Sequence, residues 1–202
     1  MTTATEPRRA VTLMLKGKRL GFADLAEPRS INGGKPSYGA RIIVEQDDAD
    51  VKAIDAAIKE VAEAQWKDKA GTVLDLLEEK GRIAFSKKPY RNSKGEVYKA
   101  FEGKFSLGVS APTTKRPTYF DEYGNPIDSP EKVAAKLYAG CYVNMKVEFY
   151  PLLRDDGNRI NCAVLGVMFS GDGESFGGGA PVASADDFSG MAKERADADD
   201  LL

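Results

Sequence analysis

Histidine is absent from this chain of 202 residues, and its absence excludes whole classes of chemistry. Ser-His-Asp and Cys-His catalysis, imidazole proton shuttles and His-containing zinc sites all need that side chain. No apolar run reaches the roughly 18 residues that a membrane-spanning helix requires, so we expect no integral membrane protein. Residues 1–9 are polar with no long apolar stretch behind them, so we expect no secretory signal.

Cysteine is scarce, with Cys141 and Cys162 lying on two apolar segments joined by the turn-like Asp156-Gly157. If those segments pair as a hairpin about that turn, each cysteine lies about ten positions from the residue opposite the other. Such an offset prevents a disulfide. We expect two small buried side chains, as is usual in an intracellular protein.

Charge is unevenly distributed, although the net charge is only −2. Apolar residues make up 42% and charged residues 30%, which indicates a folded chain long enough for one domain and a tail. Residues 80–116 contain ten basic and two acidic side chains, whereas residues 172–202 contain eight acidic and two basic ones. A basic middle with an acidic end is typical of proteins that bind polyanions.

Periodicity predicts a mainly β fold with inserted helices, of the α+β class. Period-two alternation predicts strands over residues 11–15, 40–44, 105–109 and 141–150. Residues 160–169 are apolar on both faces, which predicts a central strand. Strands spread along the chain with helices between them do not fit alternating βαβ units.

Helical spacing of apolar residues predicts an amphipathic helix over about residues 51–69, closed by Gly71. Trp66 flanks its apolar face, which favours a place at the rim of the core. A short second helix is expected around residues 73–79, and a third begins at Ser129, a capping residue followed by proline.

Composition changes at Gly171, where glycine and then Ala, Ser and acidic residues become frequent. We expect one folded domain over residues 1–170 and a flexible glycine-rich linker with an acidic tail over residues 171–202. No Gly-Lys-Ser/Thr follows the glycines, so they do not form a phosphate-binding loop. The tail is expected to recruit partner proteins or to mask the basic surface, with solubility alone as the alternative. Its candidate residues are Asp197, Asp199, Asp200, Leu201 and Leu202.

The basic middle also carries aromatic residues, and this combination is the strongest functional signal. Binding of a single strand without sequence readout needs cations for the phosphates and rings on which bases stack. The alternative is a solvated charged face with the rings in the core, which we prefer for Phe85 and Phe105. The predicted contacts are Lys87, Lys88, Tyr90, Arg91, Tyr98, Lys99, Phe101, Lys104, Lys115, Arg116 and Tyr119.

Several carboxylates could in principle hold magnesium in a DNA-processing enzyme. They lie in turn sequences, where Asp and Asn are expected in any case. They are Asp121, Glu122, Asp128, Asp155 and Asp156. We therefore predict no catalytic residues, no metal site and no cofactor, and keep the metal-dependent enzyme as an alternative. A structural or assembly protein without a nucleic-acid role is the other alternative.

Blocks spread over most of residues 10–190 resemble a phage and prophage family of single-stranded DNA-binding proteins with an OB-type fold. The matching blocks are Lys35-Pro36-Ser37-Tyr38-Gly39-Ala40 leading into Val51-Lys52-Ala53-Ile54, Lys115-Arg116-Pro117 with Gly124-Asn125-Pro126-Ile127, Tyr138-Ala139-Gly140-Cys141-Tyr142-Val143-Asn144, Phe149-Tyr150-Pro151, and Gly171-Asp172-Gly173-Glu174 with Gly177-Gly178.

The resemblance implies a small OB-like barrel that holds single-stranded DNA in a basic groove during phage DNA replication or recombination. The acidic end is similar to the tails with which bacterial single-stranded DNA-binding proteins recruit replication and repair partners. The expected location is the cytoplasm, that of the host cell if the protein is phage-encoded. A homodimer and RNA binding both stay open.

Overall fold

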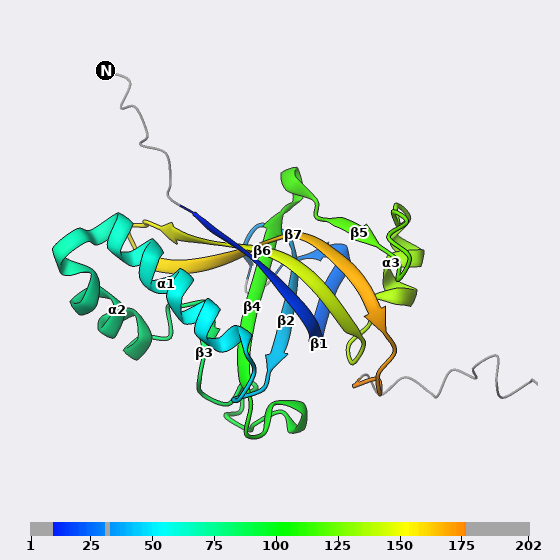
Figure 1. Ribbon diagram of the computed structural model, residues 1–202, viewed down its shortest axis with the longest axis horizontal. Coiled ribbons are helices and arrows are strands. Elements are labelled where there is room, and N and C mark those ends of the chain that lie inside the picture. Colours follow the sequence, from blue (N-terminus) through cyan, green and yellow to red (C-terminus); the bar gives the residue numbers. More distant parts are fainter. Residues whose placement is uncertain (1–9, 31–32, 177–202) are drawn as a thin grey trace, which may run out of the picture.

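The computed structural model describes residues 10–30 and 33–176 of the chain (Figure 1). The tail residues predicted to bind partners, Asp197, Asp199, Asp200, Leu201 and Leu202, lie outside the described residues. No helix in the described part is long and apolar enough to cross a membrane.

Seven strands form one sheet in the order β3-β4-β2-β1-β6-β7-β5. The strands are β1 (Val11–Arg29), β2 (Ser37–Val44), β3 (Phe85–Ser86), β4 (Phe105–Pro112), β5 (Thr118–Phe120), β6 (Tyr142–Leu152) and β7 (Arg159–Gly171). The helices are α1 (Asp50–Trp66), α2 (Ala70–Glu79) and α3 (Pro130–Lys136). All five predicted strands and all three predicted helices are confirmed, and the two short strands β3 and β5 are additional.

The sheet closes on itself because β4 also pairs with β7, in parallel, through Ser110 and Ala163. The cyclic order β1-β2-β4-β7-β6 makes a five-stranded barrel, which is the architecture of an OB-like fold. The predicted fold class is confirmed. Figure 1 shows α1 and α2 at one end of the barrel and α3 at the other.

Every second side chain of β6 points into the barrel and helps to fill its core. Val143, Met145, Val147 and Phe149 are fully buried, whereas the residues between them face outward. Phe149 lies opposite Cys162 in the β6–β7 ladder, so Cys141 is far from it along the strands. Both cysteines are buried and unpaired, as predicted, and burial raises the pKa of the Cys141 thiol to about 12.

The α1 helix packs an apolar face, including Ile54 and Val61, on the barrel core. Trp66 is half-buried at the rim of that core, which confirms its predicted place. The prediction that Gly71 ends the helical segment is wrong, since Gly71 is the second residue of α2. The turn occurs instead at Lys67, whose φ of 51° interrupts the helix, and Ala70 and Leu77 then bury α2 against the core.

An ion triad fastens α1 to the barrel. The register shift after Leu15, at Gly17 with φ of 60°, turns Lys18 inward, where only 5% of the residue is exposed. The Lys18 ammonium lies 2.5 Å from Asp48 and 2.8 Å from Asp50 at the start of α1. These acids stand at the helix N-terminus, where the sequence places negative charge.

Candidate nucleic-acid interface

A groove of about 1460 Å³ lies on the outer face of β2 and β4. Its floor consists of small residues, Gly39 on β2 and Gly108 and Ser110 on β4, with Gly39 directly opposite Ser110. Their neighbours in each strand point into the barrel core. The sequence thus leaves this part of the barrel surface open to a flat ligand.

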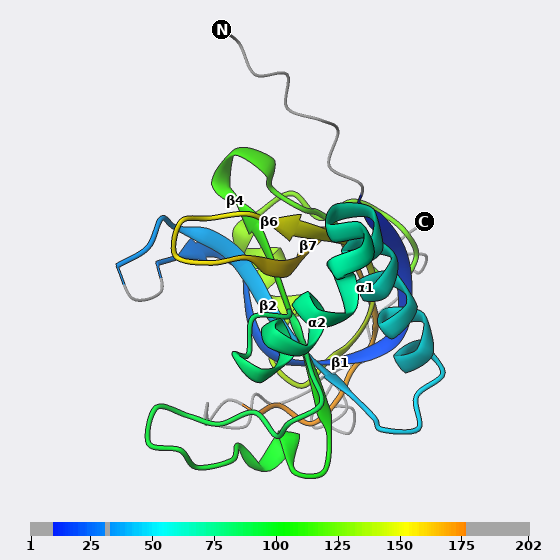
Figure 2. The same ribbon diagram turned by 90° about the vertical axis from the view of Figure 1, so that its left-hand side faces the viewer.

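The groove is bounded by segments from distant parts of the chain. Figure 2 shows α2 beside β2 and β4, and the connection between β3 and β4 extending below them. In OB folds, the face of the second and third barrel strands and the loops between strands one and two and between four and five bind oligonucleotides. Here those strands are β2 and β4, and Ser30, Arg159 and Asn161 next to those loops line the groove.

Arg41 is the cation at the centre of the floor. It faces Gly108 across the ladder, and its guanidinium carbon lies 4.0 Å from the centroid of the Tyr90 ring. A Cβ at Gly108 would come within 3.1 Å of that guanidinium, so glycine lets Arg41 lie flat. Burial lowers the pKa of Arg41, and the nearby Tyr90 opposes that effect. Arginine keeps its charge despite such shifts, so the groove offers an oriented cation to an anionic ligand.

Four aromatic rings gather beside Arg41. Tyr90 and Tyr98 are stacked with centroids 5.5 Å apart, and the Tyr98 N–H donates to the Tyr90 carbonyl at 3.1 Å. Phe22 packs edge-on against Tyr98 at 4.9 Å and lies parallel to Phe101 at 5.9 Å. Phe22 and Tyr98 are 38% and 37% exposed, so both present ring surface to the solvent.

Phe101 is a correction to the predicted contacts. It is 1% exposed, because Gly21 leaves room for its ring against β1 beneath the other three aromatics. A base cannot stack on it. Its role is to hold the segment between β3 and β4 onto the outside of the barrel.

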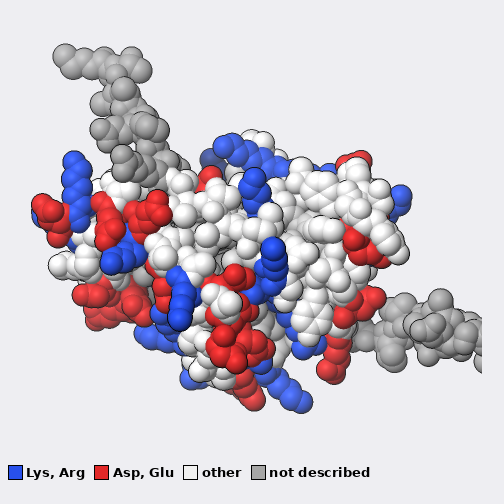
Figure 3. Space-filling model, viewed as in Figure 1, with Lys and Arg blue, Asp and Glu red and all other residues white. Residues whose placement is uncertain are grey.

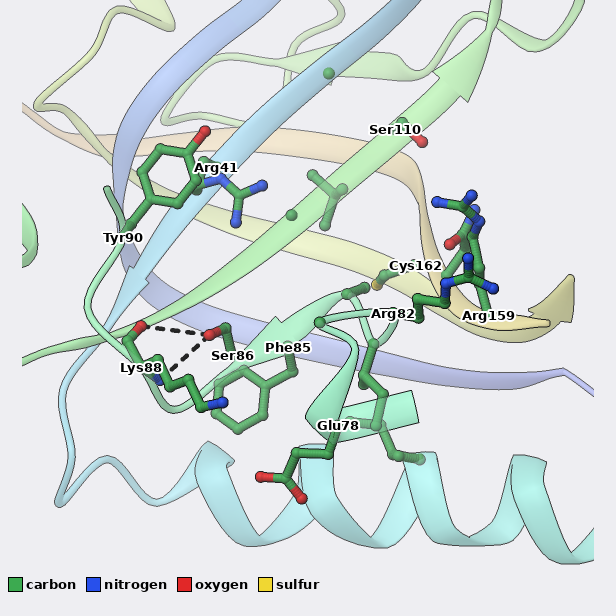
Figure 4. Close-up of a pocket in the computed structure, with 18 of the residues that line it drawn as sticks. Arg41, Glu78, Arg82, Phe85, Ser86, Lys88, Tyr90, Ser110, Arg159 and Cys162 are labelled. Atoms are coloured by element: carbon green, nitrogen blue, oxygen red, sulfur yellow. Dashed lines mark hydrogen bonds between the residues drawn. The ribbon is translucent and has the colours of Figure 1, made fainter. Parts of the chain in front are cut away.

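Two arginines flank the far end of the groove, where Figure 4 shows Arg82 close to Arg159. The Ile160 N–H donates to the Arg82 carbonyl at 3.0 Å, which fixes the two segments side by side. Arg159 pairs with Asp156 at 2.6 Å. Of the other described basic groups along the groove, Lys87 pairs with Asp55 at 2.8 Å, while Lys88 has no carboxylate of the described residues within ion-pair distance.

The structure brings four predicted contacts into the groove, Lys87, Lys88, Tyr90 and Tyr98. Arg91 and Lys99 are exposed on the connection between β3 and β4, and the Arg91 guanidinium donates to the Gly95 carbonyl at 2.7 Å. DNA contact by the four groove residues remains a prediction. DNA contact by Arg91 and Lys99, which lie outside the groove, also remains a prediction.

Lys104, Lys115, Arg116 and Tyr119 do not line the groove. Lys104 pairs with Glu45 at 2.5 Å, and Lys115 and Arg116 are exposed just after the C-terminal end of β4 at Pro112. Tyr119 is a second correction, because it is 3% exposed and its hydroxyl donates to the Leu25 carbonyl at 2.7 Å. Burial raises its pKa to about 12. Tyr119 therefore belongs to the core and cannot stack on a base.

Sequence reasoning missed Phe22, Arg41, Arg82 and Arg159. Arg41 had a usable signal, since it lies on the polar phase of the predicted strand over residues 40–44. Arg82 lies within the basic stretch. Phe22 had no signal, because its neighbours Tyr90 and Tyr98 are far away in the sequence.

Three of the five carboxylates considered for magnesium, Asp121, Glu122 and Asp156, have other partners. The Asp121 carboxylate accepts from the Tyr123 and Asn125 N–H groups at 2.9 and 2.8 Å, and a hydrogen bond from the Asn125 amide lowers its pKa. Glu122 pairs with Lys136 at 2.8 Å. Within residues 10–30 and 33–176, no three His, Cys, Asp or Glu side chains gather as a metal site would require.

Comparison with known proteins gives consistent matches. The model of the family described as "Enterobacter phage Enc34, ssDNA-binding protein" matches residues 11–202. Protein p50 of Acyrthosiphon pisum secondary endosymbiont phage 1 is 29% identical over 184 residues, covering 89% of this chain and 94% of p50.

Two solved structures share the fold. The single-stranded DNA-binding protein from bacteriophage Enc34 in complex with ssDNA has a TM-score of 0.68 at 20% identity, covering 82% of this chain and 89% of that one. A second structure of the Enc34 protein has a TM-score of 0.64 at 20% identity, covering 88% and 89%.

Proposed function

The chain belongs to the family of the Enterobacter phage Enc34 ssDNA-binding protein, and from that membership we propose that it binds single-stranded DNA in the groove across β2 and β4 without reading the base sequence. The protein acts as a non-enzymatic DNA-binding protein. Its setting is phage DNA replication or recombination in the cytoplasm of the host cell.

One observation carries this proposal: a flat cation, Arg41, lies on the glycine floor of the OB binding face, next to exposed aromatic rings. Phosphates can pair with Arg41, Arg82 and Lys88, while bases stack on Tyr98 and Phe22. Neutralisation of phosphates gives affinity for any sequence, and stacking favours unpaired bases. Exposed cations outside the groove, such as Arg91 and Lys115, are proposed contacts for a strand that runs past the groove.

Titration of labelled oligo-dT and of a matched duplex, followed by fluorescence anisotropy at two salt concentrations without divalent metal, tests the proposal. We expect tight binding to the single strand, weaker binding to the duplex, and a log–log salt slope of about −0.7 per neutralised phosphate. Absence of binding to either DNA at low salt would leave a solvated charged face and favour a structural protein. Mg²⁺-dependent turnover of the DNA would favour the enzyme alternative.

Tyr98→Ala in the same titration separates stacking from charge, because it changes no charge. The expected loss for the single strand is about 1–3 kcal/mol. Tyr123→Ala is the matched control, since Tyr123 is 83% exposed and does not line the groove. Equal affinities for the two variants would remove stacking from the mechanism.

The acidic residues after Gly171 make a second proposal, in which residues 171–202 form a linker and tail that mask the groove or recruit partner proteins. Residues 172–202 carry a net charge of −6 and are tethered to the same chain as the basic site, so their effective concentration there is high. Cutting the chain after Pro181 should raise affinity for DNA and reduce the discrimination between single strand and duplex. Identical DNA-binding isotherms for the full and shortened chains would contradict the masking role.

A further inference from the structure

One side of the groove is acidic, although its ligand is an anion. Asp75, Glu78 and Glu79 on α2 all line the groove and are exposed. Among the residues that the structure describes, none of the three has a lysine or arginine within ion-pair distance. Asp55 on α1 differs, because it is neutralised by Lys87. Lys59 on α1 and Lys80 directly after α2 also line the groove, but neither forms an ion pair with these three carboxylates.

The acidic side chains belong to a wider pattern in the helical insertion. Residues 45–79 contain eleven acidic and four basic side chains, directly before the basic stretch over residues 80–116. Figure 3 shows acidic groups spread over the end of the molecule that carries α1 and α2, with basic groups between them. Figure 4 shows Glu78 on the α2 side of the pocket, across from Arg41 and apart from Arg82 and Arg159. The groove thus has a cationic floor and far end, and an anionic flank.

The two kinds of DNA meet this arrangement differently. A flexible single strand can place its phosphates on Arg41, Arg82 and Lys88 and keep them away from α2. A duplex has about one charge per 1.7 Å of axis instead of one per 3.4 Å, and its second backbone is held rigidly beside the first. A backbone that cannot move aside is repelled by carboxylates on the flank, and like charges brought together across an interface discriminate against the wrong partner.

We propose that Asp75, Glu78 and Glu79 are specificity determinants that reject duplex DNA by repelling its second phosphate backbone. This inference rests on the proposed function of the groove. It assigns to α2 a role in excluding a ligand, separate from the groups that attract the single strand.

The test compares two triple variants of the full chain that change net charge equally. The first is Asp75→Asn/Glu78→Gln/Glu79→Gln. The control is Glu60→Gln/Asp68→Asn/Glu131→Gln, whose three positions are exposed and do not line the groove. Each is titrated with labelled oligo-dT and with a duplex of the same length at low salt, where surface charges are least screened. Glu78→Gln alone serves as a second variant should the triple variant unfold.

The α2 variant should bind the duplex about tenfold more tightly and change single-strand affinity less than about threefold. The control should shift both DNAs by the same small factor. Equal shifts for both DNAs in the α2 variant, or a shift equal to that of the control, would overturn the inference. Failure of the unmodified chain to bind oligo-dT would instead refute the proposed function, so the two failures are distinguishable.

Discussion

Replacing Lys18 with methionine lowers the free energy of unfolding by about 3 kcal/mol, the low end of the cost of breaking a buried ion pair. The substitution keeps the apolar stem and removes the ammonium that pairs with Asp48 and Asp50 at 2.5 and 2.8 Å. Both half-buried carboxylates then lose their cation, and Asp48 keeps only the hydrogen bond from the Asp50 N–H at 2.8 Å. Urea unfolding at pH 7, compared with the unmodified chain, measures the effect.

The loss of stability caused by Lys18→Met should depend on pH. Burial alone would lower the pKa of Lys18, but hydrogen bonds and attraction to Asp48 and Asp50 raise it above 10.5. Burial would raise the pKa of Asp48, but the Lys18 hydrogen bond lowers it below 3.8. The stabilisation from Asp48 is lost as pH falls through its lowered pKa, and that from Lys18 is lost as pH rises through its raised pKa. The difference between the two proteins should be largest between about pH 4 and pH 10 and shrink outside that window.

A triple variant, Lys18→Met/Asp48→Asn/Asp50→Asn, is the control for this ion triad. Removing all three charges should recover part of the lost stability, because no buried charge is left unpaired. A Lys18→Met protein as stable as the unmodified chain at pH 7 would show that α1 is held by apolar packing alone.

Arg41→Ala should weaken single-strand binding about 30-fold, as expected for loss of a hydrogen-bonded, charged contact worth about 2 kcal/mol. The salt slope should also fall by about 0.7, because one phosphate is no longer neutralised. Arg41→Lys should recover the salt slope but only part of the affinity, since an ammonium cannot lie flat between Tyr90 and Gly108. Anisotropy titrations at several salt concentrations supply both quantities.

Lys132→Ala on α3 is the matched control for Arg41, because it removes one exposed charge outside the groove. Its affinity should stay within about twofold of the unmodified chain. If Arg41→Ala behaves like Lys132→Ala, the strand does not lie on the floor between β2 and β4.

Regular elements could be predicted where one face of a segment is buried along its length. The strand expected over residues 141–150 is observed as Tyr142–Leu152, and the Ser129 hydroxyl accepts from the Lys132 N–H at the expected start of α3. Strands β3 and β5 have two and three residues, too few to show a period. Gly71 failed as a stop signal because burial of Ala70 and Leu77 outweighs the weak helix propensity of glycine.

The site was only partly predictable because sheet pairing and chain reversal assemble it. Tyr98 and Phe101 are three residues apart in one basic segment, yet the short 3-10 helix Lys99–Phe101 turns one ring inward and leaves the other exposed. Composition cannot distinguish them. Arg41 and Phe22 join Tyr90 only because the connection between β3 and β4 folds back over the outside of β1 and β2.

The seam between β4 and β7 is joined by one directly paired position, Ser110 and Ala163 next to the groove floor, and by residues 82–85, which hydrogen-bond to both strands. Local opening fluctuations concentrate where few contacts join two elements. In the proposed mode of binding, a strand of DNA that contacts Ser110 on β4 and Asn161 on β7 would bind the closed form and bridge this seam. Binding and closure are then thermodynamically linked, and each favours the other by the same free energy. On this proposal, DNA binding would stabilise the closed barrel that forms the binding site.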